Sequence, residues 1–206
     1  MLRNLYLVTH PEATHHVENL VGGWYDSSLT ARGMDDARRL AAELGKRVSG
    51  SSCLLVSSDL RRAKQTAEPI ARTLGVDVVF DGDLREQCYG EAEGTRPGST
   101  PFKPPPQNGD RMRHRDGVEG SESRLEFGGR AYAALDRIID RGYSEAIVVS
   151  HGGTVNYLIA AWIGLPLESA GYVKFKVSPG GVTHLREDDF FHDRQLVSLN
   201  DIDHLR

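Results

Sequence analysis

The chain has 206 residues, of which 39% are hydrophobic and 26% are charged. That composition is typical of a globular protein and excludes a disordered chain, a collagen-like repeat and a coiled coil. The formal net charge of -4 provides no polycationic surface, so we expect no nucleic-acid partner. The length suits one domain, which we place at residues 1–206.

The start of the chain and its cysteines indicate a cytoplasmic protein. The first apolar run, residues 5–8, ends at Thr9 and is too short for a signal peptide or a membrane span. Cys53 and Cys88 cannot form a disulfide framework, and neither has the spacing of a metal ligand. We therefore expect a protein of the cytoplasm that has no membrane partner.

Short apolar runs alternate with amphipathic segments along the chain, which predicts alternating strands and helices. The expected strands are residues 5–8, 54–56, 76–80 and 146–149, followed by 173–177, 182–185 and 195–199. The expected helices are residues 31–48, 63–74, 125–139 and 154–163. Thr30 and the run Ser57-Ser58-Asp59 are predicted helix caps, and Gly75 is a predicted helix end. This order predicts a three-layer α/β fold, a doubly wound and mostly parallel sheet flanked by helices, with an antiparallel pair among the last strands.

The pattern of strands and helices stops between Gly94 and Gly120. Residues 95–118 are rich in proline, glycine and basic side chains, and three prolines follow one another at 104–106. A long insertion without regular structure is usually either a functional lid or a disordered loop. The sequence leaves both interpretations open.

Polar residues follow the expected parallel strands, at the edge where open α/β sheets bind their ligands. In chain order they are Thr9 and His10, then Arg61 and Arg62, then Arg85 and Glu86, then Ser150 and His151. Two histidines, an arginine pair and a carboxylate suit a phosphate, because arginine binds it bidentately, histidine attacks or donates, and glutamate supplies a proton. Each residue alone has a plainer interpretation: a strand-capping histidine, a solvated arginine pair or a surface carboxylate.

Three of these segments and the segment around His10 resemble motifs of the histidine phosphatase superfamily, which contains phosphoglycerate mutases and many phosphatases. The matching runs are Ser57-Ser58-Asp59-Leu60-Arg61-Arg62-Ala63, Leu84-Arg85-Glu86-Gln87 and Ser150-His151-Gly152-Gly153. The resemblance extends over residues 5–205 and implies the phosphoglycerate mutase-like fold. It implies that His10 is the nucleophile, that Glu86 is the general acid, and that His151 and Arg62, rather than Arg61, bind the phosphate.

The first motif departs from the family pattern. Where the family has Arg-His-Gly, this chain has Thr9-His10-Pro11, so that Thr9 replaces an arginine that clamps the phosphoryl group. His16 stands where the family usually has asparagine, and we expect both Thr9 and His16 to lie at the phosphate. Losing one charged donor costs about 1.5–3 kcal/mol of interaction, or about 10²–10³-fold in rate where the donor stabilises a transition state. His15, His16 or an arginine of the lid is expected to compensate if the protein is active.

The sequence therefore favours a phosphomonoesterase that acts through a phosphohistidine on a small anionic phosphate ester. A catalytically impaired phosphate-binding or regulatory protein is the first alternative, and a phosphoglycerate-type mutase is the second. The uneven spacing of His10, His15 and His16 does not favour a metal site, and we expect neither metal nor cofactor. The sequence leaves a homodimer open and does not identify the substrate.

Overall fold

The structure is a computed structural model that describes residues 2–48 and 52–206. Within these residues the chain forms a six-stranded sheet in the order β3-β2-β4-β1-β5-β6. The strands are β1 (Asn4–Thr9), β2 (Cys53–Ser57), β3 (Val78–Phe80), β4 (Glu145–Ser150), β5 (Val182–Glu187) and β6 (Arg194–Asp201). β1 to β4 are parallel to one another, whereas β5 and β6 are antiparallel, which confirms the predicted mostly parallel sheet with an antiparallel pair.

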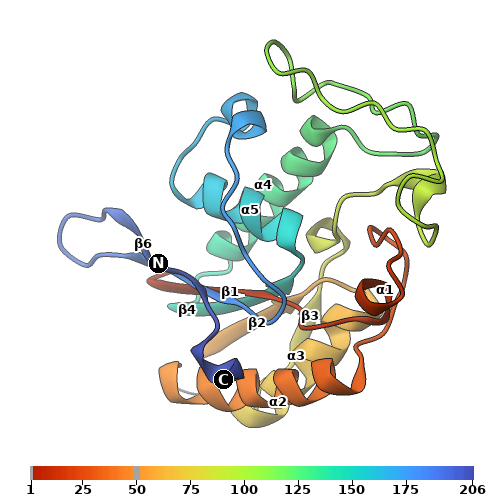
Figure 1. The fold of residues 1–206 in the computed structure, drawn as a ribbon. Coiled ribbons are helices and arrows are strands. Elements are labelled where there is room, and N and C mark those ends of the chain that lie inside the picture. Colours follow the sequence, from red (N-terminus) through yellow and green to blue (C-terminus); the bar gives the residue numbers. More distant parts are fainter. Residues whose placement is uncertain (1, 49–51) are drawn as a thin grey trace.

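Helices cover both faces of this sheet. The α-helices are α1 (Thr14–Val17), α2 (Ala31–Arg47), α3 (Arg61–Leu74), α4 (Arg124–Asp140) and α5 (Gly152–Trp162). In Figure 1, α2 and α3 lie on one face of the sheet and α4 and α5 on the other, so the three-layer arrangement is confirmed. Within the described residues, no helix is long and apolar enough to cross a membrane.

The side chains of the strands pack into two separate cores, because successive side chains of a strand point to opposite faces of the sheet. In β1, Leu5 and Leu7 pack into the core under α4 and α5, whereas Tyr6 and Val8 pack into the core over α2 and α3. Burying each large apolar side chain stabilises the fold by about 1.5–3 kcal/mol. Since both faces of β1 are covered, its carboxyl end is held rigidly, and His10 follows directly.

Most of the predicted element boundaries are close to the observed ones. Thr30 caps α2 by accepting a hydrogen bond from the Gly33 amide at 3.0 Å. Gly75 ends α3 with a φ of 67°, a left-handed conformation that glycine adopts without strain.

Two predictions about local structure are wrong. Residues 173–177 form no strand, because this stretch runs beside α5 instead of pairing with the sheet; there the Phe175 amide donates to the Asn156 side chain at 2.7 Å. The predicted cap Ser57-Ser58-Asp59 does not cap α3, whose N-cap is Leu60 without a side-chain bond. Ser58 and Asp59 instead bond to His151 and Arg85, so these polar groups serve the neighbourhood of the site.

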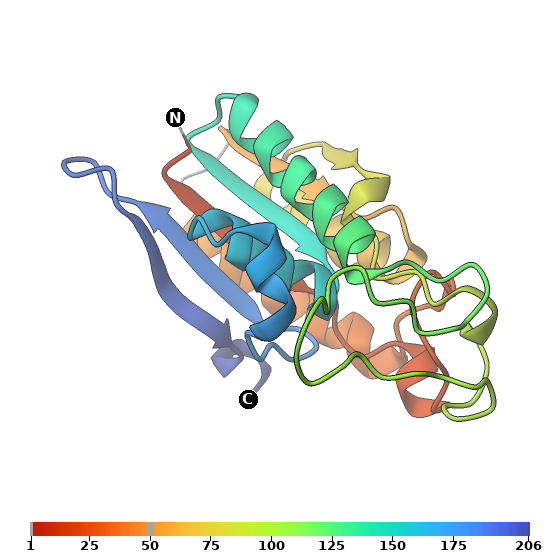
Figure 2. The same ribbon diagram turned by 90° about the horizontal axis from the view of Figure 1, so that it is seen from above.

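The loop at residues 95–118 contains no helix or strand, yet it is tied to the domain. Met112 is 2% exposed and packs into the core under α4 and α5. The Leu125 amide at the start of α4 donates to the Met112 carbonyl at 2.9 Å. Within the loop itself, the Lys103 amide donates to the Asp116 carbonyl at 2.8 Å. Figure 2 shows this loop in green beside the carboxyl end of β4. The loop therefore borders the edge where the predicted site lies.

Candidate active site

His10 and His151 lie together because their strands are neighbours. β1 and β4 are paired in register, and the His10 amide continues that pairing by donating to the Ser150 carbonyl at 3.0 Å. The two imidazole rings meet edge to face with their centroids 5.1 Å apart, and both are buried. A cavity of about 280 Å³ lies over His10; its walls include Thr9, His10, His16, Arg62 and Glu86, whereas His151 contacts His10 but does not itself line the cavity.

His10 is held as a neutral imidazole with a defined tautomer. Its Nδ1 lies 2.8 Å from the Pro11 carbonyl oxygen, which only accepts, so Nδ1 carries the proton. Its Nε2 accepts from Arg62 Nε at 3.1 Å, so this nitrogen carries a lone pair and no proton. Burial and the charge of Arg62 hold the pKa of His10 well below 6.5. An unprotonated Nε2 is the form that attacks an electrophile.

Arg62 is buried at the first turn of α3 and is the cation of this cavity. Besides His10, it donates to the carbonyls of Tyr25 and Gly23 at 2.8 and 2.7 Å. Three of its five N–H groups are thus occupied and two remain for a ligand. Burial lowers its pKa to about 10, which leaves the guanidinium charged at neutral pH. Arg61, by contrast, is exposed and its amide donates to the Asp26 carboxylate.

Glu86 reaches the same cavity from the loop after β3. Its two carboxylate oxygens accept from the amides of Gln87 and Gly153 at 3.0 and 2.9 Å. The second contact requires glycine, because a Cβ at residue 153 would stand 2.2 Å from the carboxylate. The start of α5 therefore fixes the position of Glu86.

His151 precedes α5 and is anchored on one side only. Its Nε2 lies 2.8 Å from the Ser58 hydroxyl, whereas its buried Nδ1 has no hydrogen-bond partner among the described residues. Burial, and then the charge of Arg62, lowers the pKa of His151 well below 6.5. A buried polar atom without a partner is rare in a native protein and indicates a place for a ligand.

The residues of the first motif, which differs from the family pattern, also line the cavity. Thr9 is 5% exposed, and its hydroxyl is a second buried polar group without a partner among the described residues. His16 Nδ1 accepts from the Ala13 amide at 3.2 Å, which places the proton of the neutral ring on Nε2. Burial lowers the pKa of His16, and it lowers that of His15 to about 3. In the free protein neither histidine supplies the positive charge that the missing arginine would bring.

Arg130 on α4 supports the site, although no motif in the sequence indicates it. Its guanidinium donates to the carbonyls of Asp83, Arg85 and Glu86 at 2.7–2.8 Å and pairs with Glu122. The Trp24 indole donates to the same Glu86 carbonyl at 2.8 Å. These contacts hold the loop that carries Glu86, and they join segments more than 40 residues apart.

The described residues contain no group of three or more histidine, cysteine or acidic side chains that could hold a metal ion. The histidines at residues 10, 15, 16 and 151 stack on one another, with centroid distances of 4.0–6.1 Å, instead of converging on one point.

Neutral buried histidines make the stability of the protein depend on pH. His10, His15 and His151 stay unprotonated in the fold, while the unfolded chain binds protons below about pH 6.5. The unfolded state therefore carries more protons, and stability falls as pH drops below 6.5. Each histidine contributes about 1.4 kcal/mol per pH unit below 6.5, and one such unit lies between pH 7.5 and pH 5.5. We therefore expect these three histidines to make the free energy of unfolding roughly 4 kcal/mol lower at pH 5.5 than at pH 7.5.

Urea unfolding at the two pH values measures this difference. The variant His15→Gln, which removes one of these groups, should lose about 1.4 kcal/mol of the difference in unfolding free energy between the two pH values. Equal stability of the wild type at pH 5.5 and 7.5 would show that these imidazoles are not buried in the neutral form.

His10, Arg62 and Glu86 line one cavity at the carboxyl edge of the parallel strands, and His151 lies buried against His10. A set of such side chains suits phosphoryl transfer. The comparisons with known proteins agree with this class. The family model of the histidine phosphatase superfamily (branch 1) matches residues 5–202. The chain belongs to the histidine phosphatase superfamily.

Individual relatives cover most of the chain. A Hydrogenobacter thermophilus protein named "Putative phosphoserine phosphatase 2" is 31% identical over 220 residues, which span 100% of this chain and 98% of that protein. The "Probable phosphoglycerate mutase GpmB" of Salmonella paratyphi C is 35% identical over 79% of this chain and 75% of its own length. The crystal structure of the alpha-ribazole phosphatase from Shigella flexneri matches with a TM-score of 0.79 and 26% identity, over 96% of both chains.

Proposed function

We propose that this protein is a phosphomonoesterase that works through a phosphohistidine at His10. The observation that carries the proposal is the neutral His10 ring, whose Nδ1 proton is held by the Pro11 carbonyl and whose Nε2 electron pair lies beside the Arg62 guanidinium. An imidazole prepared in this way needs no separate base, because the attacking nitrogen carries no proton.

In the first step, His10 Nε2 attacks the phosphorus atom of the ester in line with the leaving oxygen. A bond from nitrogen to phosphorus forms as the bond from phosphorus to the alkoxide oxygen breaks. Glu86, protonated before the step, gives its proton to the departing oxygen, and the neutral alcohol leaves. The Pro11 carbonyl stabilises the positive charge that develops on the ring, because it accepts from Nδ1.

In the second step, water attacks the phosphohistidine from the side that the alcohol has left. Glu86, now a carboxylate, takes the proton of the water, and the bond between Nε2 and phosphorus breaks to return neutral His10. The two free N–H groups of Arg62 and the His151 ring stabilise the phosphoryl oxygens throughout. The Thr9 hydroxyl and the Nε2–H of His16 add neutral donors where the family has an arginine and an asparagine.

This assignment predicts that Thr9→Arg raises activity. Among the described residues, Arg62 is the one cation that lines the cavity over His10, and the histidines around it are neutral. The cavity holds about 280 Å³, which leaves room beside a phosphoryl group for a second guanidinium. We expect kcat/KM for p-nitrophenyl phosphate to rise by about 10²-fold, the value of one charged donor in the transition state.

Thr9→Met is the matched control, since it adds length without charge and should lower activity. A fall in kcat/KM for Thr9→Arg, in a variant with unchanged Tm, would show that His16 or another group already occupies the place of the arginine.

A catalytically impaired phosphate-binding protein is the second candidate, and Thr9 is the observation that favours it. A panel of phosphorylated metabolites, assayed with the wild type and with His10→Ala, separates the two functions. Release of phosphate by the wild type alone supports the enzyme, whereas binding without release by either protein supports the binder. A mutase is less favoured, because the relative that spans the whole chain and the matching crystal structure are named as phosphatases.

We further propose that the protein acts in the cytoplasm on a small phosphate ester and requires no cofactor. Cys53 is a buried free cysteine and Cys88 a half-buried one, which fits a reducing compartment. The absence of a nucleic-acid partner and the formation of a homodimer stay predictions.

A further inference from the structure

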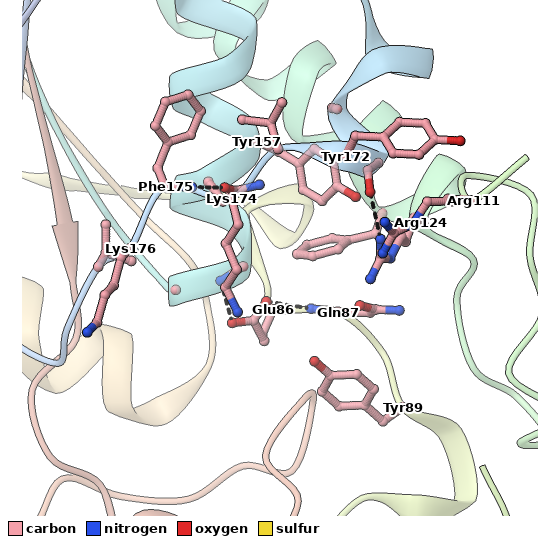
Figure 3. Close-up of a pocket in the computed structure, with 18 residues that line it drawn as sticks. Glu86, Gln87, Tyr89, Arg111, Arg124, Tyr157, Tyr172, Lys174, Phe175 and Lys176 are labelled. Carbon is pink, nitrogen blue, oxygen red and sulfur yellow. Dashed lines mark hydrogen bonds between the residues drawn. The ribbon is translucent and has the colours of Figure 1, made fainter. Parts of the chain in front are cut away.

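A second, larger cavity adjoins the one over His10. It has a volume of about 680 Å³ and lies between α5, the residues around 170–177 and the loop of residues 95–118 (Figure 3). The two cavities share four wall residues, Glu86, Tyr89, Gly152 and Val177. If the phosphoryl group binds over His10, the alcohol that it leaves must pass Glu86 into this second cavity. The assignment of this cavity to the alcohol rests on the proposed phosphatase function.

The wall of the larger cavity has an excess of positive charge. Arg111, Arg124, Lys174 and Lys176 line it, and Glu86 is the one carboxylate among its lining residues. Within residues 2–48 and 52–206, none of these four cations forms an ion pair with a carboxylate. Unpaired cations in a cleft with low-dielectric walls concentrate a positive potential there and attract anions.

Other arginines near the same loop are already neutralised. Arg113 pairs with Asp110, and Arg115 pairs with Glu126, and all four of these side chains are at least half exposed. The basic composition of residues 95–118 therefore divides into a solvated part and Arg111, which faces the cavity. The sequence alone did not separate these two groups.

The two cavity arginines are held in place while keeping donors free. Arg124 Nη1 donates to the Gly171 carbonyl at 2.9 Å, and the Arg111 guanidinium lies 5.2 Å from the centre of the Tyr172 ring. The Nε of Arg111 is buried without a hydrogen-bond partner among the described residues. Figure 3 shows the two arginines on one side of the cavity and Lys174 reaching toward Glu86, whereas Lys176 points away. Fixed guanidinium groups with unused N–H groups are suited to a carboxylate or a phosphate.

We propose that the larger cavity binds the alcohol portion of the substrate and that Arg111 and Arg124 bind a second anionic group on it, a carboxylate or a phosphate. The volume of about 680 Å³ lies within the range of sites for drug-sized ligands, so it suits an alcohol the size of a sugar or nucleoside. Five aromatic side chains also line it and suit the uncharged body of such an alcohol: Tyr89, Phe127, Tyr157, Tyr172 and Phe175.

Two matched pairs of phosphate esters test the proposal. 6-Phosphogluconate and glucitol 6-phosphate, both open-chain, differ by a carboxylate far from the ester, and fructose 1,6-bisphosphate and fructose 6-phosphate differ by a second phosphate. Calorimetric Kd values are measured on His10→Ala, which leaves each ester intact. We expect the more acidic member of at least one pair to bind 10- to 100-fold more tightly, as about 1.5–3 kcal/mol for a charged hydrogen bond implies. The pair that responds identifies the anion as carboxylate or phosphate.

In the same background, Arg111→Met and Arg124→Met should each reduce that ratio of Kd values by about tenfold. Arg113→Met is the matched control, because Arg113 belongs to the same loop but pairs with Asp110 in solvent, and it should leave the ratio unchanged. Equal Kd values within both pairs, or an equal effect of Arg111→Met and Arg113→Met, would overturn the proposal.

Turnover by the wild type is read separately from binding. A preference in Kd together with no release of phosphate from any ester would refute the proposed phosphatase function and leave the second anion site standing. Release of phosphate at equal rates, with equal Kd values within each pair, would support the function and refute the site.

Discussion

Replacing His10 by alanine should reduce turnover of phosphate esters by about 10⁶-fold, the loss expected for the removal of a nucleophile. His10 Nε2 carries the free electron pair beside Arg62, whereas the neighbouring His16 accepts with Nδ1 and carries its proton on Nε2. His151 is fully buried and is not among the residues that line the cavity over His10. Among the described residues, His10 is the histidine that presents an unprotonated Nε2 beside Arg62 at the cavity wall, so we expect no other ring to accept the phosphoryl group.

Initial rates of phosphate release with the wild type and His10→Ala measure this effect. His192→Ala is the control, because His192 lies exposed in the turn between β5 and β6 and should leave the rate unchanged. Residual turnover within tenfold of the wild type would remove His10 from the role of nucleophile.

Replacing Arg62 by alanine should lower kcat by about 10²–10³-fold, the cost of one donor in the transition state. Arg62 is 1% exposed and touches His10, and in the proposed mechanism its two unused N–H groups bind the phosphoryl oxygens. Because Arg62 also holds the carbonyls of Gly23 and Tyr25, Arg62→Lys serves as a second variant that retains the charge. It should recover part of kcat but not the geometry of a bidentate contact.

Arg61→Ala is the matched control for this prediction. Its side chain is 60% exposed and points to Asp26, so we expect less than a twofold change in kcat. Equal losses in Arg61→Ala and Arg62→Ala, with Tm values unchanged from the wild type, would refute the assignment of the phosphate to Arg62.

The position of the site was predictable from the sequence because it follows from the order of the strands. Residues that come directly after parallel strands must meet at one edge of the sheet, and His10, Arg62, Glu86 and His151 satisfy that condition. The motif resemblance then separated Arg62 from Arg61, and the structure buries the first and exposes the second. The catalytic roles of these residues are still predictions.

The contacts that support the site were not predictable because they depend on tertiary structure. Arg130 lies on an amphipathic helix among ordinary surface arginines, and only the packing of α4 brings it to the Glu86 carbonyl. Ser58 follows a strand and precedes a helix, where capping is the usual role, yet its hydroxyl bonds to His151. Residues 173–177 alternate between apolar and basic side chains, which predicts a strand, but in the structure they line a cavity.

The structure shows which groups can replace the arginine that is missing at Thr9. The compensation expected from His15 and His16 is not present as charge, since burial lowers the pKa of both rings. No arginine of the 95–118 loop lines the cavity over His10; Arg111 lines the adjoining one. In the proposed mechanism Arg62 and neutral donors therefore bind the oxygens of the phosphoryl group, and we expect a modest rate.

The covalent step is tested most directly by trapping the phosphoryl group on the protein. The wild type is mixed with a phosphorus-labelled ester, quenched in base within milliseconds, and digested for mass spectrometry of the peptide that contains His10. The proposed mechanism predicts a phosphate on His10 that survives base and is lost in acid, and none in His10→Ala. A protein that turns over the ester while His10 is unlabelled, or while another residue carries the label, would contradict it.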